Sequence, residues 1–181
     1  MGGATGSPMD VSALTAIDVH VHVHASVGAP ADRHERLEGM SDYFRAGKVS
    51  QYTVPEIAEY YRSRRMGAVV FGVDTLADGD APGRPSNEEV AELAAEHRDV
   101  LIPFASVDPA RGADAVARAR RLVDGRGIRG FKFHPNLQGF FPNDREVYPL
   151  YEVLQEHGMV ALFHSGHTGV GAGSRGGQGC G

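Results

Sequence analysis

Five short apolar segments recur along the chain, separated by longer stretches in which apolar residues follow a helical spacing. The apolar segments are rich in Val, Ile and Phe and are about as long as β-strands, which favours strands over buried helices. We therefore expect strands at residues 16–23, 67–73, 100–107, 128–133 and 159–164.

The stretches between the expected strands carry signals for the starts and ends of helices. In a capping box, the first residue and the residue three positions later each satisfy a backbone N–H of the other. Two pairs have this spacing: Thr53 with Glu56, and Ser86 with Glu89. Further helical patterns cover residues 110–123 and 144–157. Gly125 and Gly158 stand where a helix commonly ends in a left-handed residue.

Strict alternation of strands and helices predicts a parallel sheet, because parallel strands need crossover connections. Two architectures use it, the open doubly wound sheet and the closed eight-stranded (β/α)8 barrel. A doubly wound nucleotide-binding fold opens with a Gly-rich turn after its first strand, whereas here the first strand ends in histidines. A long segment, residues 25–53, follows that strand, and long loops after barrel strands commonly build active sites. We expect an α/β fold of the TIM-barrel type and disfavour a flavodoxin-like binding module.

Asp18, His20, His22 and His24 alternate with valines along the first expected strand. Side chains two positions apart on a strand lie on one face, roughly 6.6 Å from each other. The pattern predicts valines packed against helices and the four polar residues inside the barrel, where two imidazoles can converge on one ion. Histidines on an exposed strand edge, or histidines satisfied by backbone, are the structural alternatives.

Two further strands end in polar residues of the same kinds. Lys132 and His134 share one face of the fourth strand, and we expect them to act in catalysis; a lysine that reaches to solvent is the alternative. His164 ends the fifth strand, at the mouth where barrel enzymes carry catalytic residues. His167 follows in the loop, either as a substrate contact or as an ordinary loop residue.

The other candidate polar residues have simpler explanations. Asp74 and Asp108 follow the second and third strands and either reach the mouth or cap helices. Three histidines in loop or helix-end positions are interpreted as structural: His34, His97 and His157.

Composition narrows the classes of partner. The formal net charge of −5 shows no basic excess, which argues against nucleic-acid binding. Cys180 is the single cysteine, so no internal disulfide can form, and a reducing compartment fits. The first residues lack the features of a signal peptide, and no apolar run approaches the roughly 18 residues of a membrane span. We expect a soluble, cytoplasmic protein.

The end of the sequence departs from the pattern of alternating elements. After Thr168 the chain is dominated by glycine and has no apolar period. Five expected strands fall short of the eight of a barrel, which typically takes about 250 residues. We therefore expect a C-terminally truncated barrel, with a Gly-rich linker as the alternative. The expected divisions are a flexible tail at 1–15, a partial barrel at 16–169 and a disordered tail at 170–181.

Taken together, the motifs resemble a known family. Asp18-Val-His20-Val-His22, then the Gly-Phe-Lys-Phe-His-Pro segment that ends at Pro135, then Phe-His164-Ser-Gly, are similar to the amidohydrolase superfamily. Within the superfamily, the motifs most resemble the amidohydrolase-related branch, which includes decarboxylases of aminocarboxymuconate semialdehyde and resorcylate. The resemblance implies that His20, His22 and His164 bind a divalent metal, commonly zinc.

The same resemblance implies a histidine after a sixth strand and a metal-binding aspartate after an eighth, neither of which this chain contains. His24 lies outside the two-histidine pattern, so it has at most a supporting or substrate-contacting role.

The resulting hypothesis is a metal-dependent hydrolase that uses metal-activated water on a small organic molecule, aromatic or acyl. A metal-dependent carboxy-lyase uses the same ligands and is the first alternative. An inactive fragment is the second alternative, because an open five-stranded sheet leaves strand edges unpaired. A homo-oligomer is compatible with the sequence.

Overall fold

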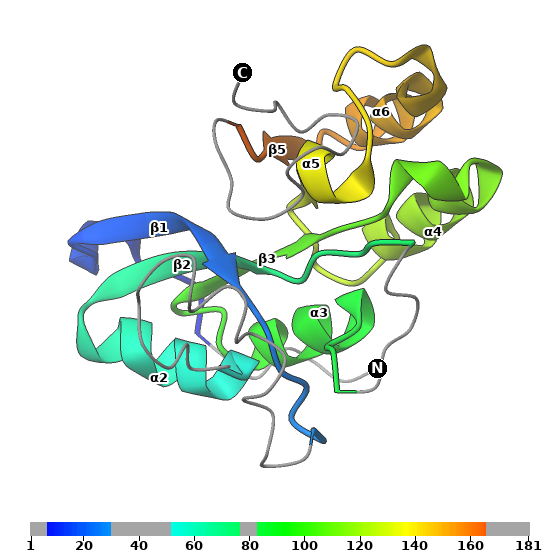
Figure 1. Ribbon diagram of the computed structural model, residues 1–181. Coiled ribbons are helices and arrows are strands. Elements are labelled where there is room, and N and C mark those ends of the chain that lie inside the picture. Colours follow the sequence, from blue (N-terminus) through cyan, green and yellow to red (C-terminus); the bar gives the residue numbers. More distant parts are fainter. Residues whose placement is uncertain (1–6, 30–51, 77–82, 166–181) are drawn as a thin grey trace, which may run out of the picture.

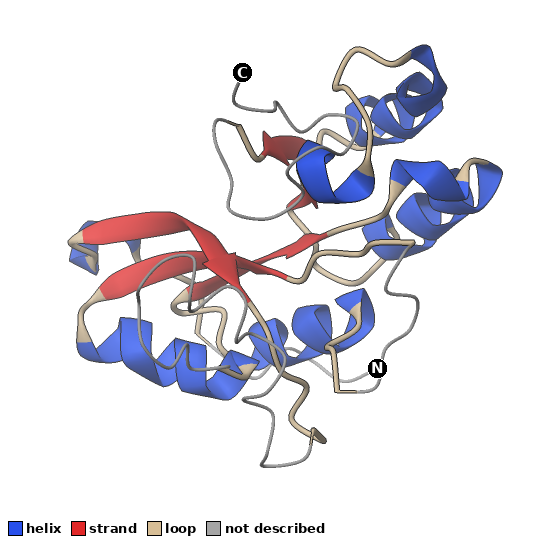
Figure 2. Ribbon diagram, in the orientation of Figure 1, coloured by secondary structure: helices blue, strands red, loops and turns tan. Residues whose placement is uncertain are grey.

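The computed structural model describes residues 7–29, 52–76 and 83–165. It contains a five-stranded, all-parallel sheet in which each strand lies beside its neighbour in sequence, in the order β1-β2-β3-β4-β5. Figures 1 and 2 show the strands with helices packed along the sheet. The strands are β1 Ala16–His22, β2 Met66–Phe71, β3 Leu101–Ala105, β4 Gly130–Phe133 and β5 Val160–Phe163.

The strand order distinguishes between the two architectures that the sequence leaves open. A doubly wound sheet reverses its strand order at a switch point, whereas a barrel adds each new strand to the same edge. The observed order has no reversal, so the prediction of a partial TIM-type barrel is confirmed.

The sheet is strongly curled. In a flat sheet with about 4.8 Å between strands, β1 and β5 would lie roughly 19 Å apart. Instead, the ring centroids of His20 on β1 and His164 directly after β5 are 6.0 Å apart. The curl therefore gives the sheet an inner face, on which the ends of distant strands meet.

The outer face is covered by helices α2 Val54–Ser63, α3 Asn87–Glu96, α4 Ala113–Val123 and α6 Tyr148–Glu156. The short helix α5 Pro135–Gln138 follows β4, and the 3-10 turns are η1 Val11–Ala13, η3 Pro109–Arg111 and η4 Arg145–Val147. No helix among the described residues is long and apolar enough to cross a membrane.

The helix-start signals were largely correct. The backbone N–H of Thr53 donates to Glu56 Oε2 at 2.8 Å, and the capping box of α2 is present. At α3, Ser86 Oγ accepts from the backbone N–H of Glu89 at 3.0 Å. The Glu89 carboxylate instead accepts from the backbone N–H of Val27 at 2.9 Å, so it ties the loop after β1 to α3.

The helix ends also follow the sequence, but two helices differ from expectation. Gly125 and Gly158 have the predicted positive φ, +85° and +62°. The expected helix at 110–123 is interrupted at Gly112, whose φ of +58° separates η3 from α4. The expected helix at 144–157 starts as the 3-10 turn η4 and becomes α-helical only at Tyr148.

Side chains from the two faces of the sheet form separate apolar clusters. On the outer face, Ala68 and Val70 of β2 pack with residues of α2 and α3. Phe131 and Phe133 of β4 pack with residues of α4 and α6. The inner face carries a smaller cluster of three buried residues: Val69, Phe71 and Phe104. Polar groups can therefore occupy the rest of the inner face.

Candidate active site

An irregularity in β1 places its polar residues on different faces of the sheet. Asp18 pairs with Ala68 and Val21 with Val70, so three steps along β1 match two along β2, as in a β-bulge. The bulge places the Asp18 side chain on the helix side, where Asp18 Oδ2 accepts from Tyr61 Oη at 2.6 Å. The expectation that Asp18 shares a face with the histidines was therefore wrong.

Asp18 nevertheless supports the site. Its Oδ1 accepts from the backbone N–H of His20 at 2.9 Å. This bond fixes the backbone of β1 at His20, the first of the inward-facing histidines. Burial, together with the bond to this carboxylate, raises the pKa of the Tyr61 hydroxyl. Sequence reasoning missed Tyr61, which occupies an ordinary apolar position of a helix and carries no signal for this contact.

His20 and His22 point from β1 to the inner face, beside Phe71. Their Nε2 atoms are 3.0 Å apart. Two nitrogens that share one ion, each about 2.0–2.1 Å from it, lie roughly 3.0–3.4 Å apart. Burial lowers the pKa of His22 to about 3 and also lowers that of His20. Both imidazoles are therefore neutral near pH 7 and able to offer lone pairs.

Lys132 of β4 reaches the same place across the curled sheet. Its Nζ lies 3.3 Å from His20 Nε2 and 5.2 Å from the centroid of the Phe71 ring. The side chain is 0% exposed, so it does not reach to solvent. Burial lowers the pKa of Lys132 to about 8. A buried amine with such a pKa can serve as a cation or as a proton carrier near neutral pH.

His134 and His164 stack at the ends of β4 and β5, with ring centroids 4.1 Å apart and planes 9° from parallel. Burial and the neighbouring imidazole lower the pKa of His134 to about 4, and burial lowers that of His164. His134 Nδ1 and His164 Nε2 are buried and lack a hydrogen-bond partner in the structure described. An unsatisfied buried polar atom costs about 1–3 kcal/mol, a cost that a bound ligand would remove.

The remaining candidates separate into supporting and structural residues. His24 stacks on His22 at 5.7 Å between centroids, and burial and Arg84 lower the pKa of His24. Asp108 accepts from the backbone N–H groups of Ala110 and Leu76, which confirms its capping interpretation.

Asp74 makes a bidentate ion pair with Arg111, at 2.7 and 2.9 Å. His97 and His157 contact Arg62 and the Val153 carbonyl, respectively, as expected of structural histidines. His34 and His167 lie outside the described residues.

The geometry can be compared with the expected ligand set of His20, His22 and His164. The first two converge, and the third lies beside them with its ring 6.0 Å from that of His20. Among the described residues, no group of three or more His, Cys, Asp or Glu side chains is arranged to hold one ion. Neutral imidazoles and unpartnered buried nitrogens nevertheless fit a divalent metal, and the three-histidine set stays a prediction.

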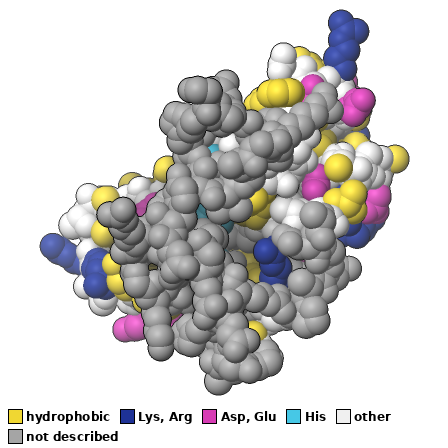
Figure 3. Space-filling model, viewed as in Figure 1, with side chains coloured by type: hydrophobic (Ala, Val, Ile, Leu, Met, Phe, Trp, Pro, Cys, Tyr) yellow, Lys and Arg dark blue, Asp and Glu magenta, His cyan; other side chains and the backbone are white. Residues whose placement is uncertain are grey.

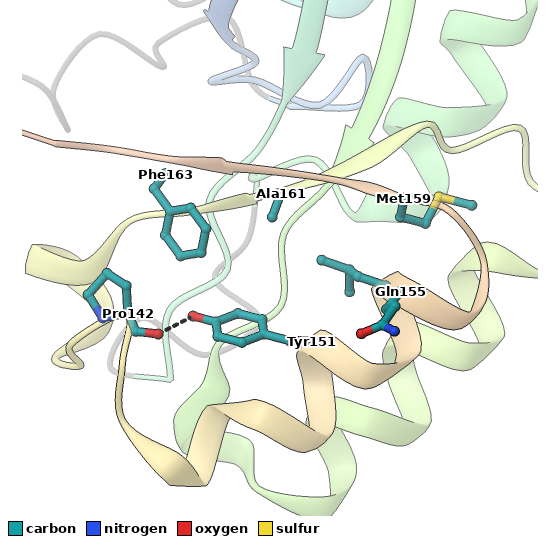
Figure 4. Close-up of a pocket in the computed structure, with 7 residues that line it drawn as sticks. Pro142, Tyr151, Gln155, Met159, Ala161 and Phe163 are labelled. Carbon is teal, nitrogen blue, oxygen red and sulfur yellow. Dashed lines mark hydrogen bonds between the residues drawn. The ribbon is translucent and has the colours of Figure 1, made fainter.

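A cavity of about 440 Å³ lies elsewhere, between α6 and β5 (Figure 4). Tyr151 Oη donates to the Pro142 carbonyl at 3.1 Å along its wall. The lining includes Ala161 and Phe163, and Phe163 packs with the outer cluster, so this is an outer-face groove. It carries none of the candidate catalytic residues. By contrast, histidine side chains show near the centre of the face in Figure 3.

Comparison with known proteins agrees with these features. A family model described as amidohydrolase matches residues 17–178. The chain belongs to the amidohydrolase family. No curated protein matches.

Three solved structures share the fold of this amidohydrolase chain. A 5-carboxyvanillate decarboxylase from Novosphingobium aromaticivorans, with bound manganese and 3-methoxy-4-hydroxy-5-nitrobenzoic acid, is 14% identical over 89% of this chain and 54% of that chain, with a TM-score of 0.60. An amidohydrolase II structure is 15% identical over 85% of this chain and 51% of that one, with a TM-score of 0.57. Apo IDCase from Metarhizium anisopliae is 12% identical over 91% and 52%, with a TM-score of 0.57. The amidohydrolase chain thus spans about half the length of the solved structures it matches.

Proposed function

We propose that this chain carries the N-terminal, metal-binding part of a metal-dependent hydrolase that acts on a small organic molecule, aromatic or acyl. The observation that carries the proposal is the approach of His20 Nε2 and His22 Nε2 to 3.0 Å on the inner face, where the pKa of both imidazoles is lowered. Membership of the amidohydrolase family supports it.

In this proposal His20 and His22 hold a divalent ion, with His164 as the third ligand from the opposite end of the sheet. When bound, such an ion supplies Lewis acidity, which polarises a carbonyl and activates water. Asp18 orients the first ligand through the backbone N–H of His20. Zinc suits imidazole ligands and is our choice of ion.

The neighbouring residues act on the substrate. Lys132 binds an anionic group of the substrate with its buried amine, and the Phe71 ring beside it keeps water from that amine. His134 offers its unpartnered Nδ1 as the atom that exchanges a hydrogen bond or proton with substrate. His167, which lies outside the described residues, is proposed as a substrate contact. The cytoplasm is the proposed location, and a homo-oligomer is compatible with the proposal.

A carboxy-lyase is the second candidate, and Lys132 favours it. Its Nζ lies 3.3 Å from His20 Nε2, where a substrate carboxylate could bridge the amine and the ion. In such a reaction the C–C bond to the carboxylate breaks, CO2 leaves, and a protein group protonates the carbon. The fold of the 5-carboxyvanillate decarboxylase is compatible with this reading.

Metal content tests the shared part of both candidates. We expect the purified chain to bind about one equivalent of zinc, measured by elemental analysis after dialysis, and His20→Ala and His22→Ala to lose it. His157→Ala is the matched control, since that imidazole bonds only to the Val153 carbonyl among the described contacts. Full zinc content in the His20→Ala, His22→Ala double variant would overturn the proposal.

Activity assays separate the two candidates. The zinc-loaded protein is incubated with ester, amide, β-keto thioester and aromatic acid substrates, and release of acid or of CO2 is measured. Hydrolysis without CO2 release supports the hydrolase, and CO2 release supports the carboxy-lyase. Lys132→Met retains metal and loses turnover of carboxylate substrates in either case. Full turnover in that variant would contradict the role given to Lys132. Metal binding without any turnover would favour the inactive-fragment alternative.

A further inference from the structure

Gln138 at the end of α5 is a buried polar side chain with an unusual number of long-range contacts. It is 5% exposed. Its Oε1 accepts from the backbone N–H of His134 at 2.7 Å, and its Nε2 donates to the Asp74 carbonyl at 2.8 Å. The same nitrogen lies 3.5 Å from both Ser106 Oγ and the Val107 carbonyl. One amide group thus contacts the segments that follow β2 and β3 and the end of β4.

These partners fix the orientation of the amide. The backbone N–H of His134 can only donate, and the Asp74 carbonyl can only accept. Exchanging the oxygen and nitrogen of Gln138 would set donor against donor and acceptor against acceptor, so the bonding pattern admits one orientation. Such a group tolerates little displacement, because its buried polar atoms would lose their partners.

The hydrogen bonds of Gln138 lie just beyond the points where the backbone ladders of β2, β3 and β4 end. The last β2–β3 pair is Val70 with Pro103, and the last β3–β4 pair is Ala105 with Phe131. Beyond these pairs the strand ends have no ladder between them in the described residues. Gln138 supplies side-chain hydrogen bonds where the backbone ladders stop, at the edge that carries the candidate site.

His134 is held by Gln138 on both sides of its backbone. Besides the bond from His134 N–H to the side chain, the backbone N–H of Gln138 donates to the His134 carbonyl at 2.9 Å. The ring of His134 lies against that of His164, and its Nδ1 is unpartnered in the structure described. The backbone bonds leave the ring nitrogen free for a ligand while fixing where the ring can lie.

We propose that Gln138 is a positioning residue, which fastens the segments after β2 and β3 to the end of β4 and thereby holds the His134 imidazole against His164. The functional meaning of this role rests on the proposed function of the site, but the contact itself does not. Among its contacts with the described residues, Gln138 touches neither the His20–His22 pair nor Lys132, so it acts through His134.

The test uses two substitutions and a control, all in the full chain and in metal-free buffer. Gln138→Met keeps the length of the side chain and removes both polar atoms. Gln138→Glu keeps an acceptor for the His134 N–H and removes the donor to Asp74. Gln155→Met, at an exposed position of α6, makes the same chemical change away from the site. Amide hydrogen exchange of His134 and the imidazole 15N–1H resonances of His134, His164 and His157 are measured by NMR.

We expect Gln138→Met to speed exchange of the His134 amide about tenfold or more, because its acceptor is gone. Gln138→Glu keeps the acceptor for the His134 N–H but sets a second oxygen against the Asp74 carbonyl, so exchange of the His134 amide should rise less than in Gln138→Met. The ring resonances of His134 and His164 should shift in Gln138→Met, whereas that of His157 should not. Gln155→Met should change none of these.

Three results would overturn the proposal. One is His134 exchange in Gln138→Met within twofold of the unmodified chain. Another is a loss of stability in that variant while the ring resonances of His134 and His164 stay in place, because that result would indicate a purely structural role for Gln138. If Gln138→Met does not fold, amide exchange is compared within the unmodified chain. There, a His134 amide that exchanges much faster than the Phe133 amide would contradict the proposal. None of these readouts involves metal or turnover, so failure here and failure of the proposed function are distinguishable.

Discussion

At the scale of single residues, the site depends on groups that never face it. Asp18 accepts from Tyr61 on one side and from the backbone of His20 on the other. The carboxylate therefore connects α2 to the point where β1 turns its histidines inward. A β-bulge beside an active site commonly serves to aim a side chain, and here it aims His20.

Tyr61→Phe tests this connection. The substitution removes only the hydroxyl that donates to Asp18 at 2.6 Å and leaves the ring in the outer-face core. We expect a loss of about 1–3 kcal/mol in the free energy of unfolding, measured with urea, because a partly buried carboxylate loses a donor. Tyr60→Phe, on an exposed neighbour in the same helix, should stay within about 0.5 kcal/mol. Equal losses in the two variants would argue against the connection.

At the scale of elements, the curl of the sheet depends on the close approach of three strands at Gly130. A Cβ added there would lie 2.5 Å from the Val160 carbonyl oxygen of β5 and 2.6 Å from the Phe104 ring of β3. Neither backbone nor a buried ring can give way easily, so glycine permits β3, β4 and β5 to meet.

Gly130→Ala should therefore destabilise the chain by at least about 1–3 kcal/mol, from overpacking of a filled site. Thermal unfolding followed by circular dichroism measures the effect. Gly72→Ala is the matched control: its added Cβ would meet only the Pro85 carbonyl at 3.7 Å, an ordinary contact. A tolerated Gly130→Ala would mean that the three strands have more room than the structure shows.

The elements also carry an ion pair whose pH dependence can be derived. Arg62 near the end of α2 makes two hydrogen bonds to Asp99 before β3, at 2.8 and 2.9 Å. Those bonds and the charge of Arg62 lower the pKa of Asp99 below its ordinary 3.8. A depressed carboxyl pKa gives stability that is complete above the unfolded value and is lost as pH falls through the folded value.

Asp99→Asn should accordingly cost up to about 1 kcal/mol at pH 7, a small amount because water screens this partly exposed pair. The difference from the unmodified chain should shrink as pH falls below about 4 and disappear once Asp99 is protonated, in urea titrations at a series of pH values. Asp114→Asn, which breaks the more exposed pair with Arg118, should show a smaller effect. A difference independent of pH would assign the effect to packing.

Features that depend on neighbouring residues in the sequence were predicted, whereas features that depend on distant contacts were missed. All five strands were predicted because each is a local apolar run, and α2 and α3 because their caps lie within four residues. The bulge in β1 was missed, since it depends on the pairing of β1 with β2 and leaves the alternation of letters unchanged. The roles of Tyr61 and Gln138 were missed for the same reason: Tyr61 is 43 residues from Asp18, and Gln138 is 64 from Asp74.

At the scale of the whole molecule, β1 and β5 are the outermost strands of the described sheet, and the curl turns their ends toward each other. The chain spans about half the length of the solved structures it matches. The proposed ligands come from both of these strand ends, His20 and His22 from β1 and His164 from β5. An ion held by all three would therefore fasten the two edges of the curled sheet to each other.

Zinc-dependent stability tests this arrangement. A ligand that binds only the folded state at 100 times its Kd adds about 2.7 kcal/mol to the free energy of unfolding. If His164 completes the set, His164→Ala should weaken zinc binding at least tenfold, which removes about 1.4 kcal/mol or more of that gain. The gain is measured as the difference between urea titrations with zinc and with chelator, so the cost of the missing ring itself cancels. His157→Ala should keep the full gain, whereas His20→Ala should lose most of it. An undiminished gain in His164→Ala would show that the His20–His22 pair binds the ion without the fifth strand.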